Sequence, residues 1–167
     1  MLTQEEFLRM MKPLLQGNGV VYRKKKNVFA RRAHAGELIQ TQTADGLETV
    51  NTAGEGDYIV RNQTNAREEY IVPAYKFIRK YKHLWPTDAQ WAEYEPLGHI
   101  VAVELTPQRL ETLTLPAEFE FTAPWGAPMT AKTGDFIGCP PDYSEVYRLA
   151  RTEFFETYIE ASGADAI

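Results

Sequence analysis

Histidine and cysteine are the residues of this chain that most readily act as nucleophiles, bases or metal ligands. His34, His83 and His99 are scattered along the sequence without the spacing typical of a metal site. Cys139 is the single cysteine, which excludes an internal disulfide and any multi-cysteine metal site. It lies in residues 138–141, Gly-Cys-Pro-Pro, where we expect a turn between a strand and a helix. An exposed thiol there, with a histidine nearby, could act as a nucleophile, and an unreactive turn cysteine is the simpler alternative.

Two aspartates are a second candidate, because each stands in the motif Gly-Asp-aromatic-Ile. If the two motifs pack together, Asp57 and Asp135 could face each other and share acid–base chemistry. Turn capping by an Asx-type hydrogen bond explains both residues more simply. The sequence contains no glycine-rich phosphate loop that leads into a helix and no Gly-x-Ser-x-Gly motif. It therefore assigns no catalytic residue, no metal site and no cofactor.

A run of basic residues is the candidate for binding a partner. Six cations fall within ten residues: Arg23, Lys24, Lys25, Lys26, Arg31 and Arg32. Such a cluster can contact phosphates and release counterions, or meet an acidic protein. The alternative is a solvated hairpin tip between strands at residues 20–22 and 28–32, where charge discourages edge aggregation. The chain as a whole has a net charge of −5, which argues against a dedicated nucleic-acid-binding protein.

The two aspartates belong to a longer pattern that occurs twice. In each copy, Gly-Asp-aromatic-Ile is followed by a tyrosine, a phenylalanine seven residues later, and a tyrosine four residues after that. The copies comprise residues 56–59 with Tyr70, Phe77 and Tyr81, and residues 134–137 with Tyr147, Phe154 and Tyr158. The glycines lie 78 residues apart and the later aromatics 77, a difference that one inserted loop residue explains. The pattern predicts that half of the chain repeats the other half.

Local signals assign a hairpin and a short helix to each copy. The glycine can take a positive φ and turn the chain into a strand of β-favouring residues. In the first copy, residues 69–72 form the expected return strand, and Pro73 fits the first turn of a helix. Phe77 and Tyr81 then share one helical face, and we expect them to pack in the core. Asp45-Gly46 predicts a further tight hairpin.

The expected fold class is α+β. Two tandem β-rich repeats, each a small curved sheet or partial barrel with a short helix, are expected to pack about a pseudo-twofold axis. Residues 1–18 form an extra N-terminal helix, in which Thr3 and Glu6 fit a capping box and Pro13 ends or kinks the helix. Residues 19–83 form repeat 1 and residues 99–160 form repeat 2. Residues 84–98 form a packed connector with a short helix at 88–94, and residues 161–167 a frayed tail.

Charge is divided unevenly between the halves. Residues 1–83 contain 14 Lys/Arg and 9 Asp/Glu, whereas residues 84–167 contain 4 and 14, so the halves carry +5 and −10. Such halves can attract each other within one molecule, pair head to tail in a homo-oligomer, or present the basic half to an acidic partner. An acidic start, the lack of a long apolar run and the single cysteine predict a cytoplasmic protein without a membrane partner.

The second copy also carries a resemblance to a known group. Residues 129–137, Met-Thr-Ala-Lys-Thr-Gly-Asp-Phe-Ile, with residues 154–158, Phe-Phe-Glu-Thr-Tyr, resemble a motif of small phage and prophage proteins of unknown function. That motif reads MTAKxGDYII, then ExYP, then FxxTYE. The first copy matches it more loosely at residues 56–60, and the second departs from it at residues 140–143 and 147–149. The resemblance implies a phage or bacterial origin, and no activity.

These observations lead to three hypotheses for function. The first is a non-catalytic interaction or scaffold protein whose partner is another protein. The second is a nucleic-acid-associated module that uses the basic segment at residues 23–32. The third is an enzyme that uses Cys139 or the pair Asp57 and Asp135.

Overall fold

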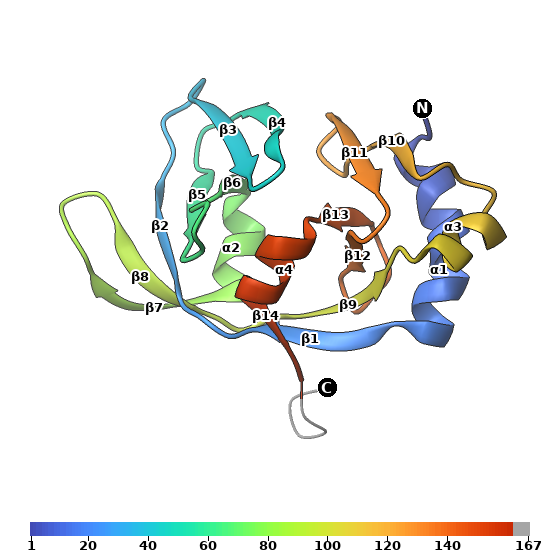
Figure 1. Ribbon diagram of the computed structural model, residues 1–167. Coiled ribbons are helices and arrows are strands. Elements are labelled where there is room, and N and C mark those ends of the chain that lie inside the picture. Colours follow the sequence, from blue (N-terminus) through green and yellow to red (C-terminus); the bar gives the residue numbers. More distant parts are fainter. Residues whose placement is uncertain (162–167) are drawn as a thin grey trace. The chain divides into compact units, whose positions relative to one another are not determined.

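The structure is a computed structural model that describes residues 1–161, apart from the side chains of Leu47 and Glu48 (Figure 1). The described chain is mixed α and β, with four helices and fourteen strands in open sheets. It divides into two compact units. Unit 1 contains Met1–Tyr22, His99–Phe155 and the segment from Glu160, and unit 2 contains Arg23–Gly98 and Glu156–Ile159. The predicted frayed tail falls almost entirely on residues 162–167, which lie outside the described residues.

Unit 1 is built from helices and strands drawn from both ends of the sequence. Its elements are α1 (Gln4–Asn18), β1 (Val20–Lys24), β9 (His99–Glu104), α3 (Pro107–Thr112), β10 (Glu118–Thr122), β11 (Pro128–Lys132), β12 (Phe136–Cys139), β13 (Tyr147–Leu149), α4 (Arg151–Thr157) and β14 (Tyr158–Glu160), where a few residues at the ends of β1, α4 and β14 belong to unit 2. β10 and β11 form a separate two-stranded hairpin.

The N-terminal helix supplies much of the core of unit 1. The Thr3 hydroxyl accepts a hydrogen bond from the Glu6 amide and the Glu6 carboxylate accepts one from the Thr3 amide, so the predicted capping box is confirmed. Phe7 is fully buried, and its ring lies 4.4 Å from that of Phe121 on β10. The helix continues past Pro13 to Asn18, because its buried apolar face offsets the roughly 3 kcal/mol cost of an internal proline.

Unit 2 repeats the same mixture of sheet, hairpin and short helix. Its elements are β2 (Val28–Arg32), β3 (Leu38–Thr43), β4 (Gly46–Thr52), β5 (Tyr58–Asn62), β6 (Glu69–Val72), α2 (Ala74–Lys80), β7 (Tyr81–Pro86) and β8 (Ala92–Pro96). The β3–β4 turn contains Gly46 at a φ of +103°, as the Asp-Gly signal predicts. The β5–β6 hairpin and the helix after Pro73 are also confirmed.

The two five-stranded sheets have matching strand orders. The order is β13-β12-β9-β1-β14 in one sheet and β6-β5-β2-β8-β7 in the other. β9 therefore takes the place that β2 has in the other sheet, and β1 takes the place of β8. Along the chain, β1 is followed by β2 and β8 is followed by β9. β1 lies in the sheet of β9 and β8 lies in the sheet of β2, so each of these two strands is in a different sheet from the strand that follows it.

Two local predictions are wrong. β1 and β2 do not form a hairpin, because they lie in different sheets. The segment at 88–94 is no helix: β7 and β8 form an antiparallel hairpin there, and the Asp88 carboxylate accepts hydrogen bonds from the amides of Gln90 and Trp91. An Asx-type turn thus uses the polar residues that resembled a helix start. The expected connector therefore contributes a strand to the sheet of unit 2.

The repeated aromatic residues form one stacked pair in each unit. Tyr58 and Phe77 lie with ring centroids 3.9 Å apart and planes at 7° in unit 2. Phe136 and Phe154 lie 3.9 Å apart with planes at 6° in unit 1. Phe77 and Phe154 are both buried, so the expectation of core packing is confirmed for the phenylalanines. The expectation that Tyr81 shares a helical face with Phe77 is wrong, because α2 ends at Lys80 and Tyr81 begins β7, where it is partly buried.

Candidate functional site

The candidate nucleophile is buried in a strand. Cys139 lies at the end of β12 rather than in a turn, and its side chain has no exposed surface. Burial, helped by the charge of Asp142, raises the pKa of its thiol to about 11. The thiol therefore stays protonated near neutral pH, whereas a nucleophilic cysteine needs its thiolate. The position predicted for Cys139 was wrong because residues 138–139 continue the β pairing with β9 and the turn begins at the prolines.

Asp135 is bound in a buried ion pair. Its Oδ2 accepts hydrogen bonds from Arg148 Nε at 2.9 Å and from the Lys132 amide at 2.9 Å, and its Oδ1 accepts one from Arg148 Nη2 at 3.2 Å. The side chains of Asp135 and Arg148 are 1% and 5% exposed. In unit 2, Asp57 Oδ2 accepts a hydrogen bond from the Gly54 amide at 2.8 Å. Both aspartates therefore cap their turns, which was the simpler of the two interpretations.

The three histidines do not assemble a metal site. His34 is exposed and its amide donates to the Glu37 carboxylate, while His83 is exposed and packs edge-on against Tyr94. His99 is half-buried at the start of β9. Within residues 1–161 there is no group of three or more histidine, cysteine, aspartate or glutamate side chains that could hold a metal ion.

One lysine of the basic segment points inward. Lys24 Nζ donates hydrogen bonds to the hydroxyls of Tyr70 and Tyr81 and to Asn62 Oδ1, the last two at 3.2 and 3.3 Å. It also lies 5.0 Å from the centre of the Tyr70 ring. Burial of the Tyr70 hydroxyl raises its pKa well above the ordinary value, so the phenol remains a neutral partner. Lys24 is thus a structural group of unit 2 and does not share a surface with its neighbours in sequence.

The other cations of the segment take different positions. Arg23, Lys25, Lys26 and Arg32 are exposed, and Lys26 Nζ donates to the Gln63 carbonyl at 3.3 Å. Arg31 forms an ion pair with Glu37, and its guanidinium lies 5.2 Å from the Trp91 ring. The six cations of residues 23–32 form one cluster in the sequence, whereas strand alternation and burial separate them in the structure. Binding of nucleic acid by this segment stays a prediction.

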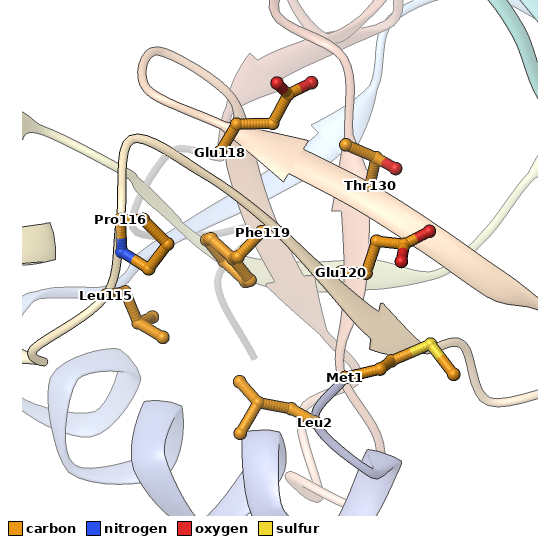
Figure 2. Close-up of a pocket in the computed structure, with 8 residues that line it drawn as sticks. All are labelled: Met1, Leu2, Leu115, Pro116, Glu118, Phe119, Glu120 and Thr130. Carbon is orange, nitrogen blue, oxygen red and sulfur yellow. The ribbon is translucent and has the colours of Figure 1, made fainter.

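A groove that sequence reasoning missed lies in unit 1 beside β10. It is shallow and open to solvent, with a volume of about 660 Å³. The residues that line it come from the start of the chain, the loop after α3 and the hairpin: Met1, Leu2, Leu115, Pro116, Glu118, Phe119, Glu120 and Thr130. Figure 2 shows the Phe119 side chain on the side of Leu2 and Leu115, and the carboxylates of Glu118 and Glu120 on the other side of the strand.

The edge of β10 beside this groove is partly occupied by the chain's own N-terminus. The Leu2 amide donates to the Glu120 carbonyl at 3.1 Å, and the Leu2 carbonyl accepts from the Thr122 amide at 2.9 Å. Leu2 is thereby bridged in parallel to Phe121. Since the backbone groups of alternate residues point to opposite edges, the even-numbered residues of β10 face this edge and the odd-numbered ones bond to β11.

Three backbone groups of β10 therefore face the groove. They are the amide and carbonyl of Glu118 and the amide of Glu120, and no backbone group within residues 1–161 pairs with them. The alternation of glutamate and phenylalanine at residues 118–121 is typical of a half-buried strand, and β10 is one. It gave no signal that one edge is open, because that depends on where Leu2 and the loop after α3 lie.

No family model matches this chain, and no match was found among curated proteins or solved structures. Within residues 1–161, every helix is too short or too polar to cross a lipid bilayer.

Proposed function

We propose that this chain is a non-catalytic interaction protein that binds an extended segment of another protein along the open edge of β10. The observation that carries the proposal is the set of free backbone groups at Glu118 and Glu120 beside a groove lined by both apolar and acidic residues. Extended peptides bind such edges by strand addition, in which main-chain hydrogen bonds supply affinity and pockets for alternate side chains supply specificity. Leu2 already makes this type of parallel pairing one step along the same edge.

The chemistry of the other candidate residues supports a role without catalysis. Cys139 is buried with a raised thiol pKa, and Asp135 is held by Arg148. A catalytic group must be able to reach a substrate, usually in a concave site. Among the residues that line the groove in unit 1 the titratable side chains are two exposed carboxylates, Glu118 and Glu120, which suit recognition of charge.

A tandem duplication accounts for the architecture around this site. It is supported by the matching strand orders of the two sheets and by the stacked pairs Tyr58–Phe77 and Phe136–Phe154. In this proposal the strands β1 and β8 were exchanged between the copies. A pseudo-twofold axis between the copies is part of the same proposal.

Origin and location are proposed from the sequence. The resemblance of residues 129–137 and 154–158 to phage and prophage proteins supports descent from a phage or bacterial genome. The single free cysteine is compatible with a reducing cytoplasm, where thiols persist.

Strand addition is tested by removing one backbone donor at the open edge. Proline at an edge strand is tolerated where its N–H faced away from the sheet, so Glu120→Pro deletes the donor without breaking a β10–β11 hydrogen bond. An array of random extended hexapeptides is probed with the wild-type protein and with the variant. We expect a set of peptides that bind the wild type and bind the variant about tenfold more weakly.

Glu120→Gln is the matched control for Glu120→Pro, because it keeps the backbone amide donor and removes only the charge of the side chain. Equal melting temperatures of the three proteins show that the fold is intact. A peptide set bound equally by the wild type and by Glu120→Pro, or no bound peptide at all, would overturn the proposal.

A further inference from the structure

The open edge of β10 presents different chemistry on its two faces. Glu118 and Glu120 expose their carboxylates on the outer face, and within residues 1–161 neither carboxylate has a hydrogen-bonding or ionic partner. Phe119, between them in sequence, turns to the opposite face with Leu2 and Leu115 (Figure 2). A chain laid along this edge would meet acidic groups on one side and apolar groups on the other.

The pairing of Leu2 defines the register available to such a chain. In parallel pairing, a residue two positions before the place of Leu2 would donate to the Glu118 carbonyl and accept from the Glu120 amide. Its side chain would lie on the face of Phe119, because bridged residues of parallel strands point to the same side of the sheet. The residue before it would lie on the face of the two carboxylates, whereas Met1 already takes the place of the residue after it.

We infer that the occupant is an extended segment of a partner protein that runs parallel to β10 and alternates apolar residues with lysine or arginine. This inference rests on the proposed function and specifies its ligand. Charge complementarity supports it: the groove is lined by two carboxylates and the α-ammonium of Met1, and the one lysine of the β10–β11 hairpin, Lys132, lies across from Glu118. The two long segments of unit 1, residues 1–22 and 99–155, together contain six Lys/Arg and ten Asp/Glu, so the wider surface has the same sign.

The same charges disfavour a second copy of this chain as the occupant. Two copies paired through their β10 edges would bring four carboxylates together at Glu118 and Glu120. Like charges opposite each other destabilise strand pairing, and charge on an edge strand is a common protection against self-association. An acidic edge that repels itself remains open to a basic strand.

The test uses short peptides whose charge and backbone are varied separately. The probe is a fluorescent hexapeptide in which lysine alternates with valine, and the comparison peptide has glutamate in place of lysine. A third peptide keeps the lysines but is N-methylated at the valines, which removes backbone donors without changing charge. Binding to the full chain is measured by fluorescence anisotropy at low salt and at 0.15 M salt, where the Debye length is about 8 Å.

We expect the lysine peptide to bind at least tenfold more tightly than the glutamate and N-methylated peptides. Glu118→Lys/Glu120→Lys should reverse the preference between lysine and glutamate. Glu5→Lys/Glu111→Lys is the matched control, because it changes the net charge equally at exposed residues of unit 1 outside the groove and should leave the preference unchanged.

The alternative outcomes separate this inference from the proposed function. Lysine and glutamate peptides that bind equally, and are both lost in Glu120→Pro, would overturn the basic occupant and leave strand addition standing. Equal binding of the N-methylated lysine peptide would show non-specific charge attraction and overturn the inference. A wild-type dimer in sedimentation that Glu120→Pro abolishes would assign the edge to a second copy and also overturn it. No peptide binding with a monomeric protein would overturn both.

Discussion

The amide of Leu2 lies 3.1 Å from the carbonyl oxygen of Glu120, and this hydrogen bond joins the start of the chain to the edge of β10. Leu2 covers only the end of that edge. The remaining backbone groups of β10 on this side face a groove, which is why the site belongs to the tertiary structure rather than to a sequence motif.

Hydrogen exchange should reveal the open edge directly. The amides of Phe119 and Phe121 bond to β11 and the amide of Thr122 bonds to Leu2, whereas those of Glu118 and Glu120 face the groove. We expect protection factors at Glu118 and Glu120 at least tenfold below those of the three bonded amides, measured by NMR. Comparable protection at all five positions would mean that the edge is closed.

Loss of Asp135 should destabilise unit 1 strongly. Asp135→Ala removes the carboxylate partner of a buried guanidinium, and breaking a buried ion pair in this way costs about 3–5 kcal/mol of unfolding free energy. Asp57→Ala removes a single turn hydrogen bond and should cost about 1 kcal/mol. Urea unfolding followed by circular dichroism measures both. A loss from Asp135→Ala no larger than that from Asp57→Ala would contradict the role assigned to Arg148.

The end of α1 requires a residue without a side chain. A Cβ at Gly19 would lie 2.3 Å from the Leu15 carbonyl oxygen and 2.5 Å from Val101 Cγ1. Gly19→Ala should therefore lower the unfolding free energy by about 1–3 kcal/mol. Gly17→Ala, two residues earlier in the helix, meets nothing within 4 Å and should raise it by about 0.5–1 kcal/mol. Thermal unfolding of the two variants should shift in opposite directions, and a shift in the same direction would refute the packing argument.

The ion pair between Arg31 and Glu37 should make stability depend on pH in acid. Hydrogen bonds from Arg31 and from the His34 amide lower the pKa of the Glu37 carboxyl from 4.5 to about 2. Because the folded pKa is the lower one, the stabilisation is complete above about pH 4.5 and is lost as the pH falls toward 2. The melting temperature of the wild type should exceed that of Glu37→Gln at neutral pH, and the difference should shrink between pH 4.5 and 2. A difference that does not change over this range would contradict the pair.

Cys139 should be unreactive in the folded protein. Its thiol is buried and its pKa is about 11, so little thiolate forms at pH 7.5 and reagents cannot reach it. We expect iodoacetamide to label the native protein at least 100-fold more slowly than the protein unfolded in urea, as followed by mass spectrometry. Rapid labelling of the native state would reopen the hypothesis of a catalytic cysteine.

Residues close together in sequence determined the local structure correctly. Thr3 and Glu6 predicted the start of α1, and Asp45-Gly46 predicted the β3–β4 turn. These signals depend on hydrogen bonds and backbone angles within a few residues, so the sequence contains all that they need. The alternation at residues 118–121 is likewise a local pattern, and it matches the two faces of β10.

Which sheet a strand joins depends on pairing with strands distant in sequence, and not on local signals. Val20–Lys24 and Val28–Arg32 are both β-forming and adjacent, yet they belong to different sheets, since each strand pairs where its apolar residues are buried. The six basic residues in and between these strands are therefore separated, with Lys24 bonded to Tyr70 and Tyr81. Propensity describes whether a segment is a strand, and it does not select the partner strand.

The sequence by itself determined the capping box of α1, the Asp45-Gly46 turn, the repeated aromatic positions and the uneven distribution of charge, because these depend on residue type and short spacing. Only the tertiary structure decided that Cys139 and Asp135 are buried, that β1 and β8 each join the sheet that does not contain the strand following them, and that the edge of β10 is open. Each of these depends on which distant segment lies alongside, and that is set by burial of apolar surface and pairing of backbone groups over the whole unit.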